Sequence, residues 1–443
     1  MTKEEILNKK IGFISLGCDK NRVDLEHMIA SIVSEGFTIT NDESEANVII
    51  VNSCAFLQAS REEALSELRY LKSLKQNNLE KVVLTGCLTR YKNLYETELE
   101  ELVDIIVPIK NNSEIASCIY SAYGLDVKCS FDMCDRVLTT PSHIAYLKIA
   151  EGCNNRCAYC AIPNIRGKYV SRDMESLVEE AKRLAQKGVK ELIIVAQDVT
   201  NYGFEKYKKR CLIDLLQQLE AIEGISWIRL HYCYPEYITD ELIDYIKQSK
   251  KVVNYIDVPL QHVCEDMLIT MNRKNTEEQT HELISKLNKE SINIRSTFIV
   301  GFPGESKQEF KQLLRFLKLY KMQNVGFFAY SNEVGTKAYE MTNQIAENVK
   351  QKRLRKAQKV QNKIYKKLQK QSIGQERDVI IDSIAVQKDE QNENFVYICR
   401  DEANSYMVDS VIQVLSNKEH NCGEIIKVKI VSSIDIDLVA EEI

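Results

Sequence analysis

Fourteen cysteines are the residues of this 443-residue sequence most able to do chemistry. The densest group is the segment EGCNNRCAYC, in which three and then two residues separate Cys153, Cys157 and Cys160. Three thiols in one loop cannot all form disulfides, and a structural zinc site needs four ligands. A cubane iron–sulfur cluster offers one external position on each of its irons. The spacing therefore favours a [4Fe–4S] cluster with one open iron, with a zinc site or a buried cysteine cluster as alternatives.

Three further cysteines each follow an apolar, strand-like run. Cys18 follows IGFISLG, Cys54 follows VIIVNS, and Cys87 follows VVLTG. The carboxyl ends of parallel strands lie along one edge of a sheet, where ligands bind, so these thiols should converge. Gly17 and Gly86 directly precede two of them, as expected where the backbone must approach a bulky inorganic group. The pattern predicts a second metal site.

The other eight cysteines show no ligand spacing, and we interpret them as packing or incidental residues. The N-terminal segment has no apolar signal-peptide core, which predicts a reducing, cytoplasmic location where structural disulfides are not expected. No run approaches the roughly 18 apolar residues that a membrane span needs. These eight are Cys118, Cys129, Cys134, Cys211, Cys233, Cys264, Cys399 and Cys422.

The elements that must position these thiols follow from the hydrophobic pattern. Short apolar runs alternate with helical patterns twice, which predicts two series of parallel βα units. The first series has candidate strands at 11–16, 48–52, 82–85 and 105–108. The second has six, at 144–150, 191–196, 227–232, 255–260, 294–300 and 325–330. After Gly374, five short strands follow, including 406–415.

The predicted fold class is α/β with three domains. Residues 9–128 form a doubly wound α/β domain that carries the second metal site. Residues 139–370 form a (βα)6 partial TIM-like barrel, for which an open doubly wound sheet is the alternative. Residues 372–443 form a small antiparallel, OB-like β-barrel.

The loop AYLKIAEGCNNRCAYCAIPNIRGKYVSR resembles that of the radical S-adenosylmethionine enzymes. The resemblance implies that the amino and carboxylate groups of S-adenosylmethionine chelate the open iron. An electron from the cluster then cleaves the sulfonium and releases a 5′-deoxyadenosyl radical, which abstracts a hydrogen atom. The resemblance also implies that Tyr159 lies against the adenine.

Other strand ends carry weaker candidates for binding S-adenosylmethionine. Gln197 and Asp198 end the second barrel strand, and the GFPGE turn, with Gly301 and Glu305, ends the fifth. His262 also ends a strand, but a histidine there is more often a hydrogen-bonded structural residue. We expect no side-chain general acid or base, because radical capture does not obviously need one.

The two cysteine sets together resemble the methylthiotransferases over essentially the whole chain, with the motifs SCAFLQASREEA, GCLTRY, VAQDVTNYG, DVPLQH and IVGFPGE. This implies a second, auxiliary [4Fe–4S] cluster that supplies sulfur, and a C-terminal TRAM domain. One S-adenosylmethionine methylates a cluster-bound sulfur, a second generates the radical, and the substrate carbon radical captures the methylthio group. The motifs are most similar to the branch that modifies the β-carbon of an aspartate in ribosomal protein S-twelve, with flavodoxin or ferredoxin as electron donor.

Charge is strongly polarised near the C-terminus. Residues 348–371 carry ten Lys or Arg and no Asp or Glu, whereas 372–443 carry fifteen acidic and six basic residues. An acidic barrel repels RNA and attracts a basic protein, which favours the ribosomal protein over the main alternative, adenosine in tRNA. A second alternative is a non-catalytic, zinc-stabilised RNA-binding module. The basic helix could contact ribosomal RNA, or it could be a solvated face that offsets the acidic barrel.

Overall fold

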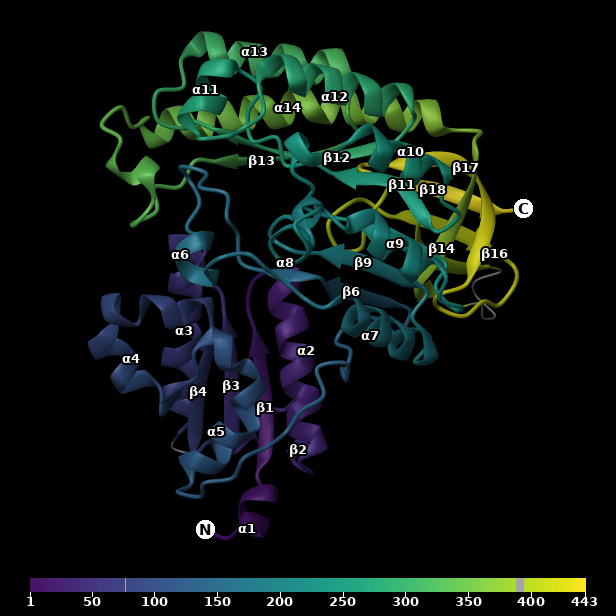
Figure 1. Ribbon diagram of the computed structural model, residues 1–443. Coiled ribbons are helices and arrows are strands. Elements are labelled where there is room, and N and C mark those ends of the chain that lie inside the picture. The colour runs from purple at the N-terminus through teal and green to yellow at the C-terminus, as the bar shows by residue number, and fades with distance from the viewer. Residues whose placement is uncertain (76, 388–393) are drawn as a thin grey trace. The chain divides into compact units, whose positions relative to one another are not determined.

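The computed structural model describes residues 1–75, 77–387 and 394–443 (Figure 1). These residues form two compact units. The first comprises Met1–Thr139, Tyr146–Asn155 and Cys160–Arg183, and the second comprises Thr140–Ala145, Arg156–Tyr159 and Leu184–Ile443. This is a different division from the three predicted domain ranges, which stay predictions. None of the described helices combines the length and apolar character needed to cross a bilayer.

The first unit is built on a five-stranded parallel sheet in the order β2–β1–β3–β4–β5. Every residue of β3 is buried, which is typical of a strand covered on both faces. The strands are β1 (Lys10–Ser15), β2 (Thr38–Ile39), β3 (Val48–Ser53), β4 (Lys81–Gly86) and β5 (Ile105–Ile106).

Side chains alternate between two apolar clusters along these strands. Ile49 and Val51 pack in one cluster with Leu65 of α3, while Val48 and Ile50 pack in the other with residues of α2 and α5. Because helices cover both faces of the sheet, the predicted doubly wound α/β fold is confirmed. The helices of this region are α1 (Lys3–Leu7), α2 (Asp19–Ser34), α3 (Gln58–Leu74), α4 (Glu96–Leu102), α5 (Ile115–Ala122), η1 (Cys87–Leu94) and η2 (Ile109–Glu114).

A second parallel sheet of six strands runs in sequence order, β6–β9–β10–β11–β12–β13. A doubly wound sheet would reverse its order at a switch point, and this sheet does not, so the partial barrel is confirmed. Its strands are β6 (Ile144–Lys148), β9 (Glu191–Val195), β10 (Trp227–Leu230), β11 (Val252–Asp257), β12 (Asn293–Val300) and β13 (Asn324–Ala329). The prediction for β11 was three residues too late, because Val252 and Val253 are buried and already belong to the strand.

Helices follow these strands as the 3.6-residue periodicity predicted. The main helices are α7 (Met174–Gln186), α9 (Leu212–Glu220), α10 (Asp240–Gln248), α12 (Glu277–Lys289), α13 (Lys307–Tyr320) and α14 (Glu347–Ser372). The shorter elements are β7 (Ala150–Glu151), α6 (Ile162–Arg166), β8 (Val170–Ser171), η3 (Val199–Asn201), α8 (Phe204–Tyr207), η4 (Pro235–Tyr237), α11 (Glu265–Thr270) and η5 (Lys337–Glu340).

The last five strands close into a barrel in the order β14–β15–β16–β18–β17. Four of the five pairings are antiparallel, and β16 pairs with β18 in parallel. The predicted strand 406–415 is wrong in its first half, because β16 starts at Ile412 and Asp409 accepts the N–H of Ser405 in a loop. The strands are β14 (Glu376–Val386), β15 (Phe395–Arg400), β16 (Ile412–Ser416), β17 (Ile425–Ile434) and β18 (Asp437–Glu442).

Candidate metal centres

Cys18, Cys54 and Cys87 lie at the carboxyl ends of β1, β3 and β4, along one edge of the parallel sheet. Gly17 has a φ of +101°, and a Cβ atom there would lie 2.8 Å from the Cβ and 3.1 Å from the Sγ of Cys54. The turn that carries Cys18 therefore touches the turn that carries Cys54. Gly86 has a φ of +85°, and a Cβ there would lie 2.4 Å from the backbone oxygen of Ser53. Both close approaches require glycine.

The three thiols share one electrostatic environment. Burial and, more weakly, the neighbouring Cys18 and Cys54 thiols raise the pKa of Cys87 to about 11, although the Arg166 guanidinium opposes the shift. Cys87 is buried, Cys54 is half-buried and Cys18 is exposed. The structure thus brings together the three residues that the strand-end pattern predicted, and it adds a cation beside them.

Arg166 is held beside these cysteines by a buried ionic network in the first unit. Its guanidinium lies 2.9 Å from the Asp24 carboxylate and 2.7 Å from Glu151, and it donates to Asn21. Lys148 pairs with the same two carboxylates. Burial alone would lower the pKa of Arg166, but Asp24 and Glu151 hold that pKa well above its usual value. Two cations and two carboxylates balance one another here.

Cys153, Cys157 and Cys160 lie within eight consecutive residues after β7. In the first unit, the Cys153 N–H donates to the Gly167 oxygen at 3.1 Å. Gly152 has a φ of +77°, and a Cβ there would lie 2.2 Å from the Lys168 oxygen. A side chain at that position would displace the start of the loop.

Cys157, in the second unit, has two polar neighbours. Its Sγ lies 3.7 Å from the Tyr234 hydroxyl and 3.8 Å from Nη1 of Arg273. Arg273 is buried, and its guanidinium lies 4.4 Å from the centre of the Tyr234 ring. Burial alone would lower the pKa of Arg273, but Tyr159, Tyr234, Cys157 and Glu236 together hold that pKa well above its usual value. A second buried arginine therefore stands beside the second cysteine set.

The donors fit iron–sulfur clusters in their chemistry. Across the described ranges, no three His, Cys, Asp or Glu side chains converge as the ligands of one metal ion do. In a [4Fe–4S] cluster each thiolate binds a different iron, so the sulfurs need not meet at one point. A cluster held by thiolates carries negative charge, and Arg166 and Arg273 each place a buried cation next to a thiol.

The weaker sequence candidates occupy the predicted strand ends in the second unit. Tyr159 packs edge-on against Phe302, with ring centres 6.5 Å apart, beside an apolar cluster that includes Met267. Gln197 and Asp198 lie two and three residues after the end of β9, and the Asp198 carboxylate is buried and accepts the Thr200 hydroxyl at 2.7 Å. Their contacts with S-adenosylmethionine stay predictions.

The Glu305 carboxylate is already engaged by protein groups. It accepts the Gly301 N–H at 2.5 Å, pairs with Arg353 of α14, and lies 3.4 Å from Nε2 of His262. His262 is fully buried, and its Nδ1 accepts the Cys264 N–H at 3.1 Å. Glu305 therefore ties α14 to the turn after β12, and His262 is a structural residue.

Sequence reasoning missed Arg166, Arg273 and Tyr234. Arg273 is 116 positions from Cys157, and it lies in a loop with no motif. The ion pair of Arg166 with Asp24 and its hydrogen bond to Asn21 join segments more than a hundred residues apart along the chain, so no local pattern could reveal them.

The remaining eight cysteines are free thiols in the structure, with no disulfide among them or with the other six. Burial raises the pKa of seven of these thiols, which favours the neutral form expected of packing residues. The seven are Cys118, Cys129, Cys134, Cys211, Cys233, Cys264 and Cys399.

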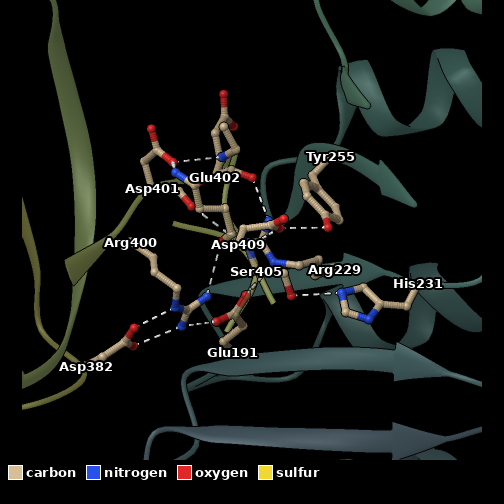
Figure 2. Close-up of polar contacts among 12 residues, drawn as sticks. Glu191, Arg229, His231, Tyr255, Asp382, Arg400, Asp401, Glu402, Ser405 and Asp409 are labelled. Atoms are coloured by element: carbon tan, nitrogen blue, oxygen red, sulfur yellow. Dashed lines mark hydrogen bonds and ion pairs between the residues drawn. The ribbon is translucent and has the colours of Figure 1, made fainter. Parts of the chain in front are cut away.

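A separate cluster of buried charges joins the two barrels of the second unit (Figure 2). The Glu191 carboxylate lies 2.7 Å from Nε of Arg229 and 2.7 Å from Nη2 of Arg400, and Arg400 also pairs with Asp382. Burial would raise the pKa of Glu191, but the two arginines lower it to about 2. Tyr255 donates to Asp409 at 3.0 Å. The C-terminal barrel is thus fixed to β9 by the Glu191–Arg400 pair, to β10 by hydrogen bonds from Arg229 to backbone oxygens of 401–402, and to β11 by the Tyr255 hydroxyl.

Three family models match successive parts of the chain. The Radical SAM superfamily matches residues 147–317, the TRAM domain matches 373–443, and a family described as Uncharacterized protein family UPF0004 matches 10–108. Among solved structures, the radical S-adenosylmethionine methyltransferase TsrM from Kitasatospora setae, with cobalamin and a [4Fe-4S] cluster bound, has a TM-score of 0.55 at 14% identity. It covers 75% of this chain and 77% of its own. This likeness shows the fold.

Curated relatives match almost end to end. The ribosomal protein uS12 methylthiotransferase RimO of Clostridium tetani is 41% identical over 97% of this chain and 97% of its own. The protein of the same name from Caldanaerobacter subterraneus subsp. tengcongensis is 42% identical over 98% of this chain and 100% of its own. This chain belongs to the RimO family of ribosomal protein uS12 methylthiotransferases.

Proposed function

We propose that this protein is a radical S-adenosylmethionine enzyme that attaches a methylthio group to the β-carbon of an aspartate in ribosomal protein uS12. The observation that carries the proposal is the identity of 41–42% over 97–98% of the chain with proteins named for that activity. The relatives are named as methylthiotransferases, which favours this function over a non-catalytic zinc module. A ribosomal substrate would place the reaction in the cytoplasm.

The two cysteine sets would hold the two [4Fe–4S] clusters. Cys153, Cys157 and Cys160 would bind the cluster that serves S-adenosylmethionine, in keeping with the family match over 147–317. Cys18, Cys54 and Cys87 would bind the auxiliary cluster, supported by their convergence at one sheet edge. The domain ranges 9–128, 139–370 and 372–443 would then correspond to sulfur supply, radical generation and substrate capture.

The chain's own residues would bind the two clusters and S-adenosylmethionine, orient them and shield them from water. When bound, these groups supply a radical that removes a hydrogen atom from the substrate carbon and a methylthio group that replaces it. Arg166 and Arg273 offset the negative charge of the ligated thiolates. Tyr159 and Phe302 present an apolar wall that keeps water from a reactive centre. Arg353 and Gly301 hold the Glu305 carboxylate, which fixes the turn after β12.

The charge of the C-terminal region supports a protein substrate over tRNA. Residues 372–443 carry fifteen acidic and six basic residues, and the resulting field attracts a basic ribosomal protein.

A flavodoxin or ferredoxin would deliver the electrons.

Peptide mass spectrometry of uS12 from cells with and without this gene tests the proposal. We expect the methylthio mass on one aspartate-containing peptide to disappear in the deletion strain and to return with the wild-type gene. Intact uS12 modification in the deletion strain, together with loss of methylthio-adenosine from tRNA, would show that the tRNA alternative is correct.

A further inference from the structure

The inner and outer faces of α14 differ in whether their cations form ion pairs. On the inner face, Arg353 pairs with Glu305, and Lys350 lies 3.4 Å from Glu347. On the outer face, eight cations are exposed, and none of them forms an ion pair with a residue in the described ranges. These eight are Lys352, Arg355, Lys356, Lys359, Lys363, Lys366, Lys367 and Lys370.

Such a face costs stability. Five pairs of these cations stand four positions apart, and each like-charged pair destabilises a helix by about 0.2–0.5 kcal/mol. No Asp or Glu occurs between 348 and 371 to relieve the repulsion. A face selected only for solubility would gain by mixing both signs of charge. An anionic partner on this face would relieve the repulsion.

Helix α13 extends the basic surface. It runs alongside α14 (Figure 1), and the two helices line a trough of about 350 Å³. Lys318 and Lys321 stand on one side of the trough, and Lys363 and Lys367 stand on the other. A second shallow trough of about 380 Å³ follows the outer face of α14, where Gln358 and Asn362 alternate with basic side chains. Among the residues that the structure describes, no aromatic side chain lines either trough, although buried aromatic anchors are typical of protein–protein interfaces.

We propose that this basic surface, defined as the outer face of α14 and the α13–α14 trough, binds the sugar–phosphate backbone of RNA. Residues 352–370 span about 27 Å of helix, enough to meet several consecutive phosphates. Regularly spaced cations are what backbone recognition requires, and amide side chains such as Gln358 and Asn362 can reach riboses. The acidic barrel at 372–443 repels RNA, so the RNA lies on α14. That the RNA is ribosomal rests on the proposed function, in which uS12 is presented within its particle.

This basic surface differs in character from the charge cluster of Figure 2. There, Glu191, Arg229, Arg400 and Asp382 satisfy one another and are buried. Helix α14 itself is anchored by hydrogen bonds from uncharged side chains: Gln361 donates to the Met322 oxygen at 2.8 Å, and Tyr365 donates to the Ile436 oxygen at 2.9 Å. The basic face is therefore displayed on a fixed helix.

Fluorescence anisotropy with the cluster-loaded full chain and a labelled 16-nucleotide single-stranded RNA tests the proposal. We expect the logarithm of the binding constant to fall with the logarithm of salt concentration with a slope of about −3 to −6, as four to eight phosphate contacts predict. The combined variant Lys359→Gln, Lys363→Gln, Lys366→Gln should bind about 10- to 100-fold more weakly, with a slope shallower by about 2. Glutamine is a good helix former, so α14 should stay folded and S-adenosylmethionine cleavage should not change.

A matched variant removes three exposed lysines elsewhere: Lys182→Gln, Lys247→Gln, Lys289→Gln. It should bind RNA like the wild type. Equal weakening by both variants, or no weakening by the α14 variant, would overturn the proposal. Loss of binding in Lys427→Gln, Lys429→Gln alone would place the RNA on the C-terminal barrel and also overturn it. Competition by poly-glutamate as strong as that by RNA of equal charge would identify an acidic protein as the partner instead.

The same variant separates this proposal from the proposed function. Modification of free uS12 should keep its kcat/KM, whereas modification of uS12 in the small subunit should show about a tenfold higher KM. If uS12 is not modified at all, the proposed function fails, but the anisotropy result still decides whether the basic surface binds RNA.

Discussion

The two cysteine sets differ most in how their neighbouring arginines are balanced. Arg166, near Cys87, is engaged by Asp24 and Glu151, so protein carboxylates already use its charge. Arg273, near Cys157, faces the Tyr234 ring, and its nearest carboxylate, Glu236, is 4.0 Å away. A balanced cation suits a group that must be held in place. A cation that no close carboxylate neutralises, such as Arg273, suits a cluster that must accept an electron, because the positive charge stabilises the reduced, more negative cluster.

The largest effect is expected from Cys153→Ala, Cys157→Ala or Cys160→Ala. Each change would remove one of the three proposed ligands of the cluster that serves S-adenosylmethionine, so S-adenosylmethionine cleavage and methylthio transfer should both disappear. Anaerobic iron analysis should fall from about eight to about four irons per chain. Cys118→Ala is the control, because this thiol lies outside both sets, and it should keep both activities. Cleavage that survives in all three ligand variants would break the assignment of this set.

Arg166→Met and Arg273→Met should separate the roles of the two arginines. Arg166→Met removes one of the two cations that pair with Asp24 and Glu151 and leaves Lys148 in place. Breaking such a buried network costs about 3–5 kcal/mol of unfolding free energy. Arg273→Met should cost less stability but should slow S-adenosylmethionine cleavage at least about tenfold at normal iron content, as loss of a cluster's neighbouring groups does.

Lysine at each position is the matched control, because it keeps the charge and alters the geometry. Arg273→Met should also lower the reduction potential of the cluster that serves S-adenosylmethionine, because it removes a neighbouring positive charge. Arg273→Lys should recover part of the cleavage rate and bring that potential back toward the wild-type value. If Arg273→Met and Arg166→Met change stability and potential alike, the contrast between the two arginines is wrong.

Gly86→Ala and Gly124→Ala should sharpen the geometry of the auxiliary set. Both glycines have positive φ, +85° and +78°, so alanine costs about 1–2 kcal/mol at either site. Of the two, Gly86 also meets backbone, with the Ser53 oxygen 2.4 Å from the added Cβ, whereas no atom of the described residues lies within 4 Å of a Cβ added at Gly124. Gly86→Ala should therefore lose auxiliary iron and keep S-adenosylmethionine cleavage, and Gly124→Ala should keep full iron. Equal iron in the two variants would show that the turn before Cys87 tolerates displacement.

Glu191→Gln should have the smallest effect on either iron–sulfur cluster. The buried charges around Glu191 already balance one another without a cofactor. The folded pKa of Glu191 lies at about 2, below the ordinary 4.5, so the carboxylate contributes stability above pH 4.5 and loses it as pH falls toward 2. The unfolding free energy of the metal-free wild type should exceed that of Glu191→Gln by about 3 kcal/mol at most at pH 7, and the difference should shrink across that window. Urea titrations at pH 7, 4.5 and 3 would measure this. A difference that grows on acidification would contradict the sign.

The sequence was sufficient for the elements and for the cysteines, because both depend on local pattern. The βα alternation placed Cys18, Cys54 and Cys87 at strand ends, and a parallel sheet has only one carboxyl edge. The partners of those cysteines could not be predicted. Arg166 and Arg273 are positioned by tertiary contacts between residues more than a hundred positions apart, and the balance of buried charges leaves no periodic pattern in the sequence.

Loop conformation was the other failure. The run YMVDSVIQVL looks like one strand, but Asp409 competes for backbone by accepting the Ser405 N–H and the Tyr255 hydroxyl. Only its second half, β16, joins the barrel. The sequence likewise showed the charge of 348–371 but not that the outer cations of α14 lack partners among the described residues while the inner ones are paired.

The most direct test of the central claim uses the triple variant Cys18→Ala, Cys54→Ala, Cys87→Ala with uS12 as substrate. S-adenosylmethionine cleavage and methylthiolated uS12 are quantified in the same anaerobic reaction. Two cysteine sets with separate roles predict cleavage near the wild-type rate and no methylthiolated product. Methylthiolated uS12 formed by this variant would contradict the account.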